Sequence, residues 1–205
     1  MYDPETIDAL ASGQIVVRDF FTVNGKTLGG AAAHFAYWTG EDNVAVNVIP
    51  AGGGSVVSRN FVGGGTLLDV PAVVDAIGFD ANTIAIGLDH ISKAVGSPMD
   101  MVYGNNVRVG RVELHRGLFD PATWNLVSTP HLLFAGRVDQ PSIDDAAAGG
   151  EGGLTLSVIS SAIDLTKTNP AMESDEHQKL RGDRFRRWGD SAATVETWWG
   201  QAKGS

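Results

Sequence analysis

The spacing of apolar residues changes near the start of the chain, from a helical to a strand period. Ile7 and Leu10 recur at a helical interval behind an Asp3-Pro4 pair. Asp3 suits the N-cap position, Pro4 suits the first helical residue, and Gly13 is a typical helix stop. We therefore expect a short helix between Asp3 and Gly13.

After Gly13 the pattern predicts a succession of short strands. Residues 14–23 are rich in β-branched and aromatic side chains, and they are followed by Asn24-Gly25, a dipeptide typical of tight hairpin turns. A hairpin is expected at that dipeptide. Further strands are expected over residues 34–39, 44–49, 56–57, 61–62, 83–88, 131–138 and 154–158. Glycine triplets at residues 52–54 and 63–65 are read as turns between strands.

The middle of the chain is more mixed. Residues 89–95 predict a brief helix, with Gly96 and Pro98 ending it. Alternating valines over residues 107–114 predict a strand, in which Gly110 suits a β-bulge. The first part of the chain is thus expected to be mainly β, with one or two short helices.

The composition shifts after Asp164. Residues 167–205 contain few β-branched residues, many charges and three of the five tryptophans. This segment has too little aliphatic content for a core of its own, although residues 174–180 could form a short helix with Ser174 as its cap. We expect a β-rich domain over residues 1–165 and a C-terminal arm over residues 166–205. The arm is expected to pack on the domain or on a neighbouring subunit.

Composition narrows the class of protein without indicating an activity. With 43% apolar and 19% charged residues among 205, the chain is too hydrophobic for an intrinsically disordered protein. It has no cysteine, which excludes disulfides, thiolate metal sites and a cysteine nucleophile. The formal net charge of −9 disfavours a protein whose main task is to grip a nucleic-acid backbone.

No membrane or export segment is expected. The first five residues are acidic and polar, unlike the basic start of a signal peptide. The apolar run over residues 70–77 is interrupted by Pro71 and Asp75 and is far too short to span a bilayer. We expect a soluble protein that is made in a cytoplasm and not secreted through a signal.

The motifs of common catalytic and cofactor sites are not recognisable. The five histidines show no shared metal-ligand spacing, and the glycine triplets lack the strand–loop–helix context of a nucleotide site. These histidines are His34, His90, His115, His131 and His177. We expect no catalytic residue, no bound metal and no cofactor.

Two groups of acidic residues leave alternatives open. Asp139 lies near Asp144 and Asp145, and Asp89 precedes His90. A glycosidase needs two carboxylates on opposite sides of a sugar, whereas acids beside glycine loops are usually solvated. Whether Asp144 and Asp145 bind a cation also stays open, because they lack the alternating ligand spacing of an EF-hand.

The sharpest local anomaly is a basic and aromatic segment over residues 179–188, which holds five of the 15 Lys and Arg residues. It could be a subunit interface, a solvated face or a nucleic-acid site. An upstream acidic run, which includes Asp175 and Glu176, would repel phosphate and favours the interface. The candidate interface residues are Arg181, Arg184, Phe185, Arg186, Arg187, Trp188, Trp198 and Trp199.

Several short motifs, taken in order, resemble one family. They are Tyr37-Trp38-Thr39-Gly40, Arg108-Val109-Gly110-Arg111-Val112-Glu113-Leu114, Leu133-Phe134-Ala135-Gly136-Arg137-Val138-Asp139, Ser160-Ser161-Ala162-Ile163-Asp164-Leu165 and Asp175-Glu176-His177-Gln178-Lys179 with Gly182-Asp183-Arg184-Phe185. Together they resemble the tail-tip hub proteins of long-tailed phages of Gram-negative bacteria and of related gene-transfer agents. The resemblance extends from about Ile15 to Trp199. Arg181 stands where the family often has proline, and the region of residues 52–65 is particular to this chain.

The resemblance implies a β-barrel or sandwich similar to the tail-tube domain, assembled as a ring, most simply a trimer, at the distal end of a tail. Such a hub would join the tube to the receptor-binding or membrane-penetrating tip as a non-enzymatic virion protein. Its partners would be copies of itself, tube or distal-tail proteins, and tip or fibre proteins, with DNA only in transit. Longer family members have a cysteine-bearing extension, and no cluster is carried over to this cysteine-free chain.

Two alternatives remain at the level of sequence. One is a distal-tail or tube-ring protein of the same particle, with sixfold instead of threefold symmetry. The other is a carbohydrate-active β-protein. It would be either a binding module that uses Tyr37, Trp38 and Trp124 as sugar platforms, or a hydrolase that uses the region of Asp139 and Asp144.

Overall fold

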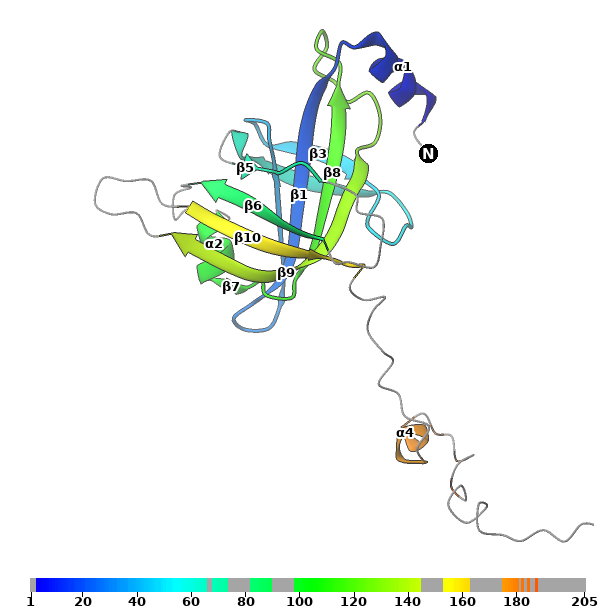
Figure 1. The fold of residues 1–205 in the computed structure, drawn as a ribbon, viewed down its shortest axis with the longest axis vertical. Helices are drawn as coiled ribbons and strands as arrows, with labels where there is room; N and C mark the ends of the chain where they lie inside the picture. Colours follow the sequence, from blue (N-terminus) through cyan, green and yellow to red (C-terminus); the bar gives the residue numbers. More distant parts are fainter. Residues whose placement is uncertain are drawn as a thin grey trace, which may run out of the picture. The chain divides into compact units, whose positions relative to one another are not determined.

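A computed structural model describes the chain over residues 3–65, 68–73, 82–89, 98–144, 153–162, 175–180, 182, 184 and 187. The chain divides into two units, Met1–Thr166 and Lys167–Ser205. The first unit is a β-sheet domain, and the second contributes a short helix, α4 (Figure 1).

The described elements of the first unit are mostly strands. In chain order they are α1 (Pro4–Ser12), β1 (Val16–Thr27), β2 (Ala32–Trp38), β3 (Val44–Val48), β4 (Val57–Gly63), β5 (Leu68–Asp69), β6 (Thr83–Asp89), α2 (Pro98–Tyr103), β7 (Asn105–Asn106), β8 (Arg111–Phe119), β9 (His131–Asp144) and β10 (Gly153–Ser160). The expectation of a mainly β fold with few helices is confirmed. The second unit contributes α4 (Asp175–Lys179), which begins one residue after the predicted cap Ser174; Ser174 itself lies outside the described residues.

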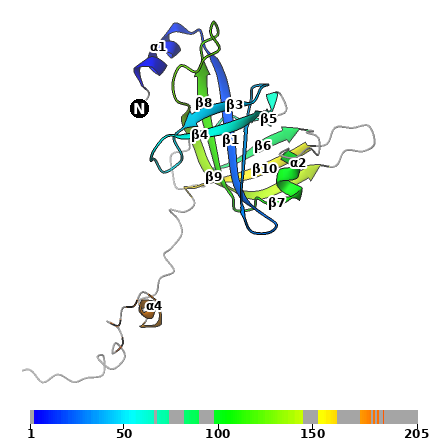
Figure 2. The same ribbon diagram turned by 180° about the vertical axis from the view of Figure 1, so that it is seen from behind.

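Ten described strands form one mixed sheet in the order β3-β4-β2-β1-β8-β9-β10-β6-β5, and β7 pairs with the end of β1. Neighbouring strands are antiparallel except β2 and β4, which are parallel and share only two residue pairs. At that short junction the β3–β4 hairpin turns across the sheet, and from behind it lies over β1 and β8 (Figure 2).

Strand β1 supplies alternate side chains to two separate cores. Phe21 and Val23 join an aliphatic cluster with buried residues of β6, β8, β9 and β10. Phe20, on the opposite face, packs with Phe61 of β4 and Phe119 of β8 in a second cluster beneath the β3–β4 hairpin. Because successive strand residues point to opposite faces, a strand buried on both sides feeds two layers. We call these layers the aliphatic core and the hairpin core.

Helix α1 forms as its sequence predicts. The Asp3 carboxylate accepts a hydrogen bond from the Thr6 backbone N–H at 2.8 Å, and Gly13 adopts the left-handed conformation with φ of 69°. This N–H bond lowers the pKa of Asp3, as expected for a carboxylate that caps a helix. Thr6 is fully buried, and its hydroxyl lies 2.7 Å from Ser128 Oγ. The buried Thr6 contact attaches the helix to the loop before β9.

The predicted hairpin turn at Asn24-Gly25 is wrong. Strand β1 continues through both residues, which pair with His34 and Ala33 of β2, and the chain reverses after Thr27 instead. Gly25 is needed for another reason, because a Cβ there would lie 2.9 Å from the carbonyl oxygen of Asn106. Because glycine has no Cβ, β7 can approach β1 closely at this position. The glycine is thus required for packing, although in the sequence it looks like a turn residue.

Two further boundaries differ from the prediction. Pro98, read as a helix stop, is the first residue of α2, a position where proline is favoured because its missing N–H would be unpaired there anyway. Residues 90–97, which include most of the predicted helix, lie outside the described residues. Strand β8 begins only at Arg111, because residues 108–109 form a turn in which Val109 has a positive φ of 63°.

The other predicted strands are confirmed, with changes in length. The segments expected over residues 34–39, 44–49 and 83–88 are β2, β3 and β6, and the pieces around residues 56–62 form one strand, β4. Strand β9 continues beyond the predicted end at Val138 to Asp144. It can do so because β10 pairs with it along this extension.

Candidate functional site

A pocket of about 720 Å³ opens beside the hairpin core, where the ends of β2 and β8 meet the loops that follow them. Two sequence candidates, Trp38 and Trp124, both line it although they are far apart in the sequence. The other lining residues are Arg18, Thr39, Gly40, Glu41, Asp42, Gly65, Leu68 and Phe119. We call this site the Trp38–Trp124 pocket.

The indole of Trp38 is held in a fixed orientation. It stacks on Phe20 with the ring centroids 5.4 Å apart and an interplanar angle of 7°. Its Nε1–H donates a hydrogen bond to the backbone carbonyl of Asp42 at 2.6 Å. A Cβ at Gly40 would overlap the indole ring, so only glycine allows the ring to lie there. The floor of the pocket is therefore rigid.

Trp124 forms the opposite wall and is held differently. It lies in the turn after β8 with a positive φ of 56°, and its side chain is 60% exposed. Its backbone N–H donates to the carbonyl of Asp120 at 2.8 Å, and the Asp120 carboxylate accepts bonds from Ala122 N–H and the Thr123 hydroxyl. These bonds stabilise the turn, which holds an exposed indole on a backbone conformation that is unfavourable for L-residues.

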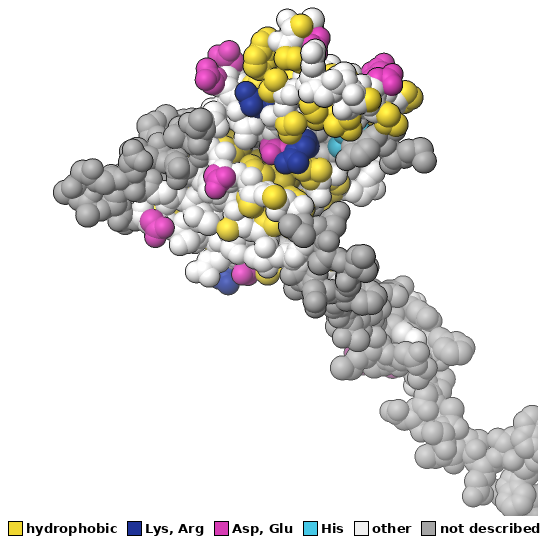
Figure 3. Space-filling model, turned by 45° about the horizontal axis from the view of Figure 1, so that its top comes forward, with side chains coloured by type: hydrophobic (Ala, Val, Ile, Leu, Met, Phe, Trp, Pro, Cys, Tyr) yellow, Lys and Arg dark blue, Asp and Glu magenta, His cyan; other side chains and the backbone are white. Residues whose placement is uncertain are grey.

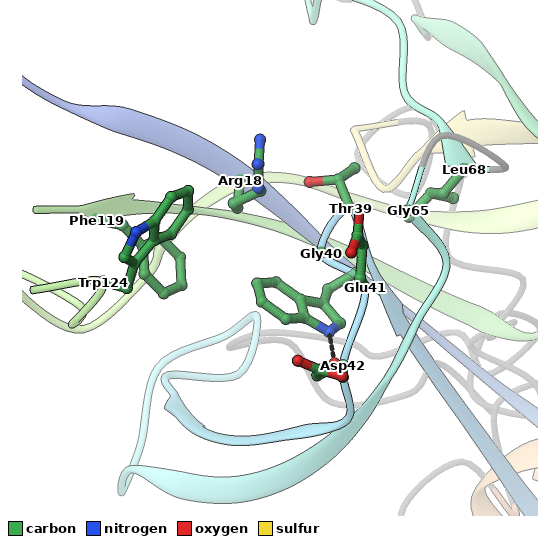
Figure 4. Close-up of a pocket in the computed structure, with 10 residues that line it drawn as sticks. Arg18, Thr39, Gly40, Glu41, Asp42, Gly65, Leu68, Phe119 and Trp124 are labelled. Carbon is green, nitrogen blue, oxygen red and sulfur yellow. Dashed lines mark hydrogen bonds between the residues drawn. The ribbon is translucent and has the colours of Figure 1, made fainter. Parts of the chain in front are cut away.

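Charged groups of both signs complete the rim. Figure 4 shows Phe119 and Trp124 at one end of the pocket and Leu68 at the other. Arg18, Glu41 and Asp42 lie between these two ends. Both carboxylates are exposed, and Arg18 is partly exposed. The site thus combines flat aromatic surfaces with hydrogen-bond donors and acceptors.

A buried polar cluster lies under the β3–β4 hairpin. Arg59 of β4 contacts the Glu113 carboxylate of β8 at 2.6 Å and the Thr22 hydroxyl of β1 at 3.1 Å. The second Glu113 oxygen accepts the backbone N–H of Ala51 at 3.1 Å. Glu113 is only 2% exposed, so the ion pair attaches the hairpin to the sheet from within.

His115 lies in the same layer and is fully buried. Its Nε2 donates to the backbone carbonyl of Ile49 at 2.9 Å, which leaves the proton on Nε2. Its Nδ1 has no hydrogen-bond partner among the described residues. Burial lowers the pKa of His115, because a charged imidazole would lose its hydration there. This histidine is therefore neutral in the folded protein near pH 7.

Tyr37 is excluded as a sugar platform. It is 2% exposed and belongs to the aliphatic core, because it points to the face of β2 opposite to Trp38. Burial raises the pKa of its phenol. The adjacent aromatic residues Tyr37 and Trp38 therefore lie in two different layers.

The proposed carboxylate pair of Asp139 and Asp144 does not form a glycosidase site. Both residues are exposed on the single strand β9, five positions apart. At about 3.3 Å per residue, their backbones are separated by roughly 16 Å, beyond the ~5–9.5 Å that glycosidases use. Asp145 lies outside the described residues, as does His90, the neighbour of Asp89.

Two further histidines, His34 and His131, have separate partners in the described structure. His34 Nδ1 lies 2.6 Å from the side-chain oxygen of Asn24, and His131 Nε2 lies 3.2 Å from the Thr6 hydroxyl. Among the described residues, no group of three or more His, Asp or Glu side chains is placed to hold a metal ion.

Most of the candidate interface residues of the arm lie outside the described residues, namely Arg181, Phe185, Arg186, Trp188, Trp198 and Trp199. Arg184 and Arg187 are described and exposed, and the N–H of Arg187 donates to the carbonyl of Arg184. In α4, Lys179 Nζ contacts the carboxylates of Asp175 and Glu176, which raises the pKa of Lys179.

Sequence reasoning missed several lining residues of the pocket, above all Arg18, Glu41 and Phe119. One signal was available, because Glu41 and Asp42 follow Trp38 after only two residues. Arg18 and Phe119 gave no local signal. They reach the pocket only because β1 and β8 pair in register, with Val16 opposite Phe119.

No described helix has the length and apolar character needed to cross a membrane. No protein-family model matches the chain, and no curated protein matches it. A solved structure that the chain resembles is described as "Virion of native gene transfer agent (GTA) particle", with 16% identity and a TM-score of 0.45. The match covers 82% of this chain and 49% of that chain, so this chain spans about half of its length.

Proposed function

We propose that this protein is a structural virion component of a phage-type tail, a hub subunit that forms a ring between the tail tube and the distal tip. The proposal rests on the ordered motifs that resemble tail-tip hub proteins. In the first unit, one of these motifs lies on β9, and another spans the turn before β8 and the start of β8. A β-domain that presents strand ends and loops suits a protein whose task is contact with other proteins.

The observation that best supports assembly is an exposed apolar surface around α1. Ile7 and Leu10 of α1 are 53% and 45% exposed although the helix is anchored by Thr6. Ile49 and Leu132, also exposed, line a hollow of about 480 Å³ together with Asp3 at the start of this helix. Hydrophobic side chains gather on this part of the surface (Figure 3). Contiguous apolar surface of this kind marks protein interfaces.

The test is the mass of the purified full-length protein in solution, measured by native mass spectrometry and checked by negative-stain imaging. A closed ring supports the proposal, three subunits favour the hub, and six favour the alternative of a distal-tail or tube ring. A protein that stays monomeric at every concentration contradicts both.

A matched pair of variants locates the contact. Leu10→Asp adds a charge to the exposed face of α1 and should abolish the ring while thermal unfolding stays unchanged, because the residue is not part of either core. Leu28→Asp places the same charge at a 79% exposed position after β1 and should leave the ring intact. Equal ring formation by both variants would contradict a contact through α1.

The arm gives a second, independent test. We propose that residues 167–205 contribute to contacts between subunits through the basic and aromatic residues that include Arg184 and Arg187. A chain ending at Thr166 should keep its cooperative unfolding transition, because both cores lie within the first unit. It should fail to form closed rings or to join a tail tube. If the shortened chain still assembles, the arm has no such role.

A further inference from the structure

We propose that the Trp38–Trp124 pocket binds a neutral oligosaccharide. This binding activity goes beyond the proposed assembly role and does not depend on it, because the pocket and the surface around α1 have no lining residue in common.

Folding alone does not account for the tryptophan at position 124, Trp124. A bulky side chain at a positive φ is strained, and glycine or asparagine would satisfy the same turn at lower cost. The indole buries little surface, since it is 60% exposed. Trp124 therefore strains the backbone and contributes little to a core. We infer that its exposed ring serves to contact a ligand outside the domain.

The walls of the pocket have the shape and chemical character that suit a sugar ring. The fixed indole of Trp38, the exposed indole of Trp124 and the ring of Phe119 line one cavity. The negative face of an aromatic ring attracts weakly positive C–H groups. A pyranose presents such C–H groups on one face and hydroxyls around its edge, so it matches an aromatic wall with a polar rim.

The charges on the rim of the pocket favour a ligand without net charge. Arg18 would repel a cationic ligand, and Glu41 and Asp42 would repel an anionic ligand. A purely apolar ligand would bury these charges without partners, which is costly. Sugar hydroxyls are both donors and acceptors, so a neutral saccharide can bond to Arg18 and to the carboxylates at once. The volume of about 720 Å³ lies within the range of ~300–1,000 Å³ typical of small-molecule sites, which admits more than one sugar ring.

The experiment uses the full-length protein on an array of neutral, acidic and amino-substituted oligosaccharides. Neutral oligosaccharides that bind are then titrated by intrinsic tryptophan fluorescence. We expect binding of at least one neutral oligosaccharide at micromolar to millimolar concentration. In the Trp124→Gly variant, this affinity should fall about tenfold or more, because one stacking wall is lost. The double variant with Glu41→Gln and Asp42→Asn should also bind the same oligosaccharide with lower affinity.

The control is Tyr103→Ala, which removes an aromatic ring that is similarly exposed, at 58%, but does not line the pocket. Its affinity for the same oligosaccharide should equal that of the unaltered protein. Thermal unfolding of every variant checks the fold, and Trp124→Ala serves as a second variant if Trp124→Gly does not fold.

Three results would overturn the proposal. They are no binding of any neutral oligosaccharide at millimolar concentration, binding restricted to acidic or amino-substituted sugars, and equal affinities of the Trp124→Gly and Tyr103→Ala variants. A proline-rich or basic peptide that occupies the pocket in competition, with no sugar bound, would identify it as a protein-docking site instead. None of these results changes the mass of the ring, so the two proposals fail separately.

Discussion

The two faces of the β1–β8 pair differ sharply in chemistry. On one face, Val23, Val112 and Leu114 pack in the aliphatic core, most of whose described members are Val, Ile, Leu and Met. On the other face, the same strands supply Phe20, Glu113 and His115 to the layer beneath the β3–β4 hairpin. The first face is thus packed mainly by aliphatic side chains, whereas the second adds stacked rings and an ion pair that require specific partners.

This difference separates stability from specificity. Aliphatic burial is non-directional and tolerates exchange of similar side chains. A buried ion pair contributes little net stability, but a wrong placement leaves a charge unpaired, so it discriminates against other positions of the hairpin. The Trp38–Trp124 pocket lies at the edge of this directional layer, where Trp38 and Phe119 are fixed by ring packing.

The largest effect is expected from breaking the ion pair on one side only. Arg59→Met leaves the Glu113 carboxylate buried without its partner and should lower the free energy of unfolding by about 3–5 kcal/mol. Arg59→Met combined with Glu113→Leu should recover most of this loss, because no charge stays buried. Urea unfolding of both variants measures the difference, and a double variant as unstable as the single one would contradict this account.

A substitution in the aliphatic core should cost slightly less. Leu156 is fully buried in β10, and Leu156→Ala removes its contacts and leaves a cavity, for an expected loss of about 3 kcal/mol. Leu28→Ala, at an exposed position, should change the free energy of unfolding by less than about 0.5 kcal/mol. Urea unfolding measures both; similar losses at the two positions would mean that the aliphatic core is not tightly packed.

The buried His115 should make the layer beneath the β3–β4 hairpin sensitive to acid. Because burial lowers the pKa of His115 in the folded protein below its ordinary value of 6.5, the unfolded chain binds a proton more readily. The contribution of His115 to stability is therefore fully present above about pH 6.5 and is lost as the pH drops below it, by up to about 1.4 kcal/mol per pH unit for this one histidine. Thermal unfolding between neutral pH and pH 5 measures this slope, and His115→Gln should reduce it. If the slope of the His115→Gln variant equals that of the unaltered protein, other groups cause the acid sensitivity.

The smallest effect concerns the turn that holds Trp124. Glycine adopts a positive φ freely, so Trp124→Gly should raise the free energy of unfolding by up to about 1 kcal/mol. Trp124→Ala keeps the strained conformation and should give no such gain. Thermal unfolding of the two variants measures this comparison, and a lower stability of the glycine variant would show that the indole supports the fold.

The sequence correctly predicted those helix ends and strands that depend only on residues close together in the chain. The cap of α1 follows from Asp3, Pro4 and Gly13, because a helix end needs only residues within one turn. The alternation of Val44, Val46 and Val48 predicts β3 for a similar reason. The hairpin predicted at Gly25 is wrong, because in the sequence a glycine required by a distant strand looks the same as one required by a turn.

The amino-acid sequence alone thus determined the mainly β character, the first helix, most strand positions and the change of composition after Asp164, because these depend on local conformation and on hydrophobic period. Tertiary structure decided which face of each strand meets which layer, and so it separated Tyr37 from Trp38 and placed Trp38 in a pocket with Trp124. It also paired Arg59 with Glu113 across 54 positions of the chain. Such contacts depend on strand order and register, which are set by the packing of the whole domain and not by any single segment.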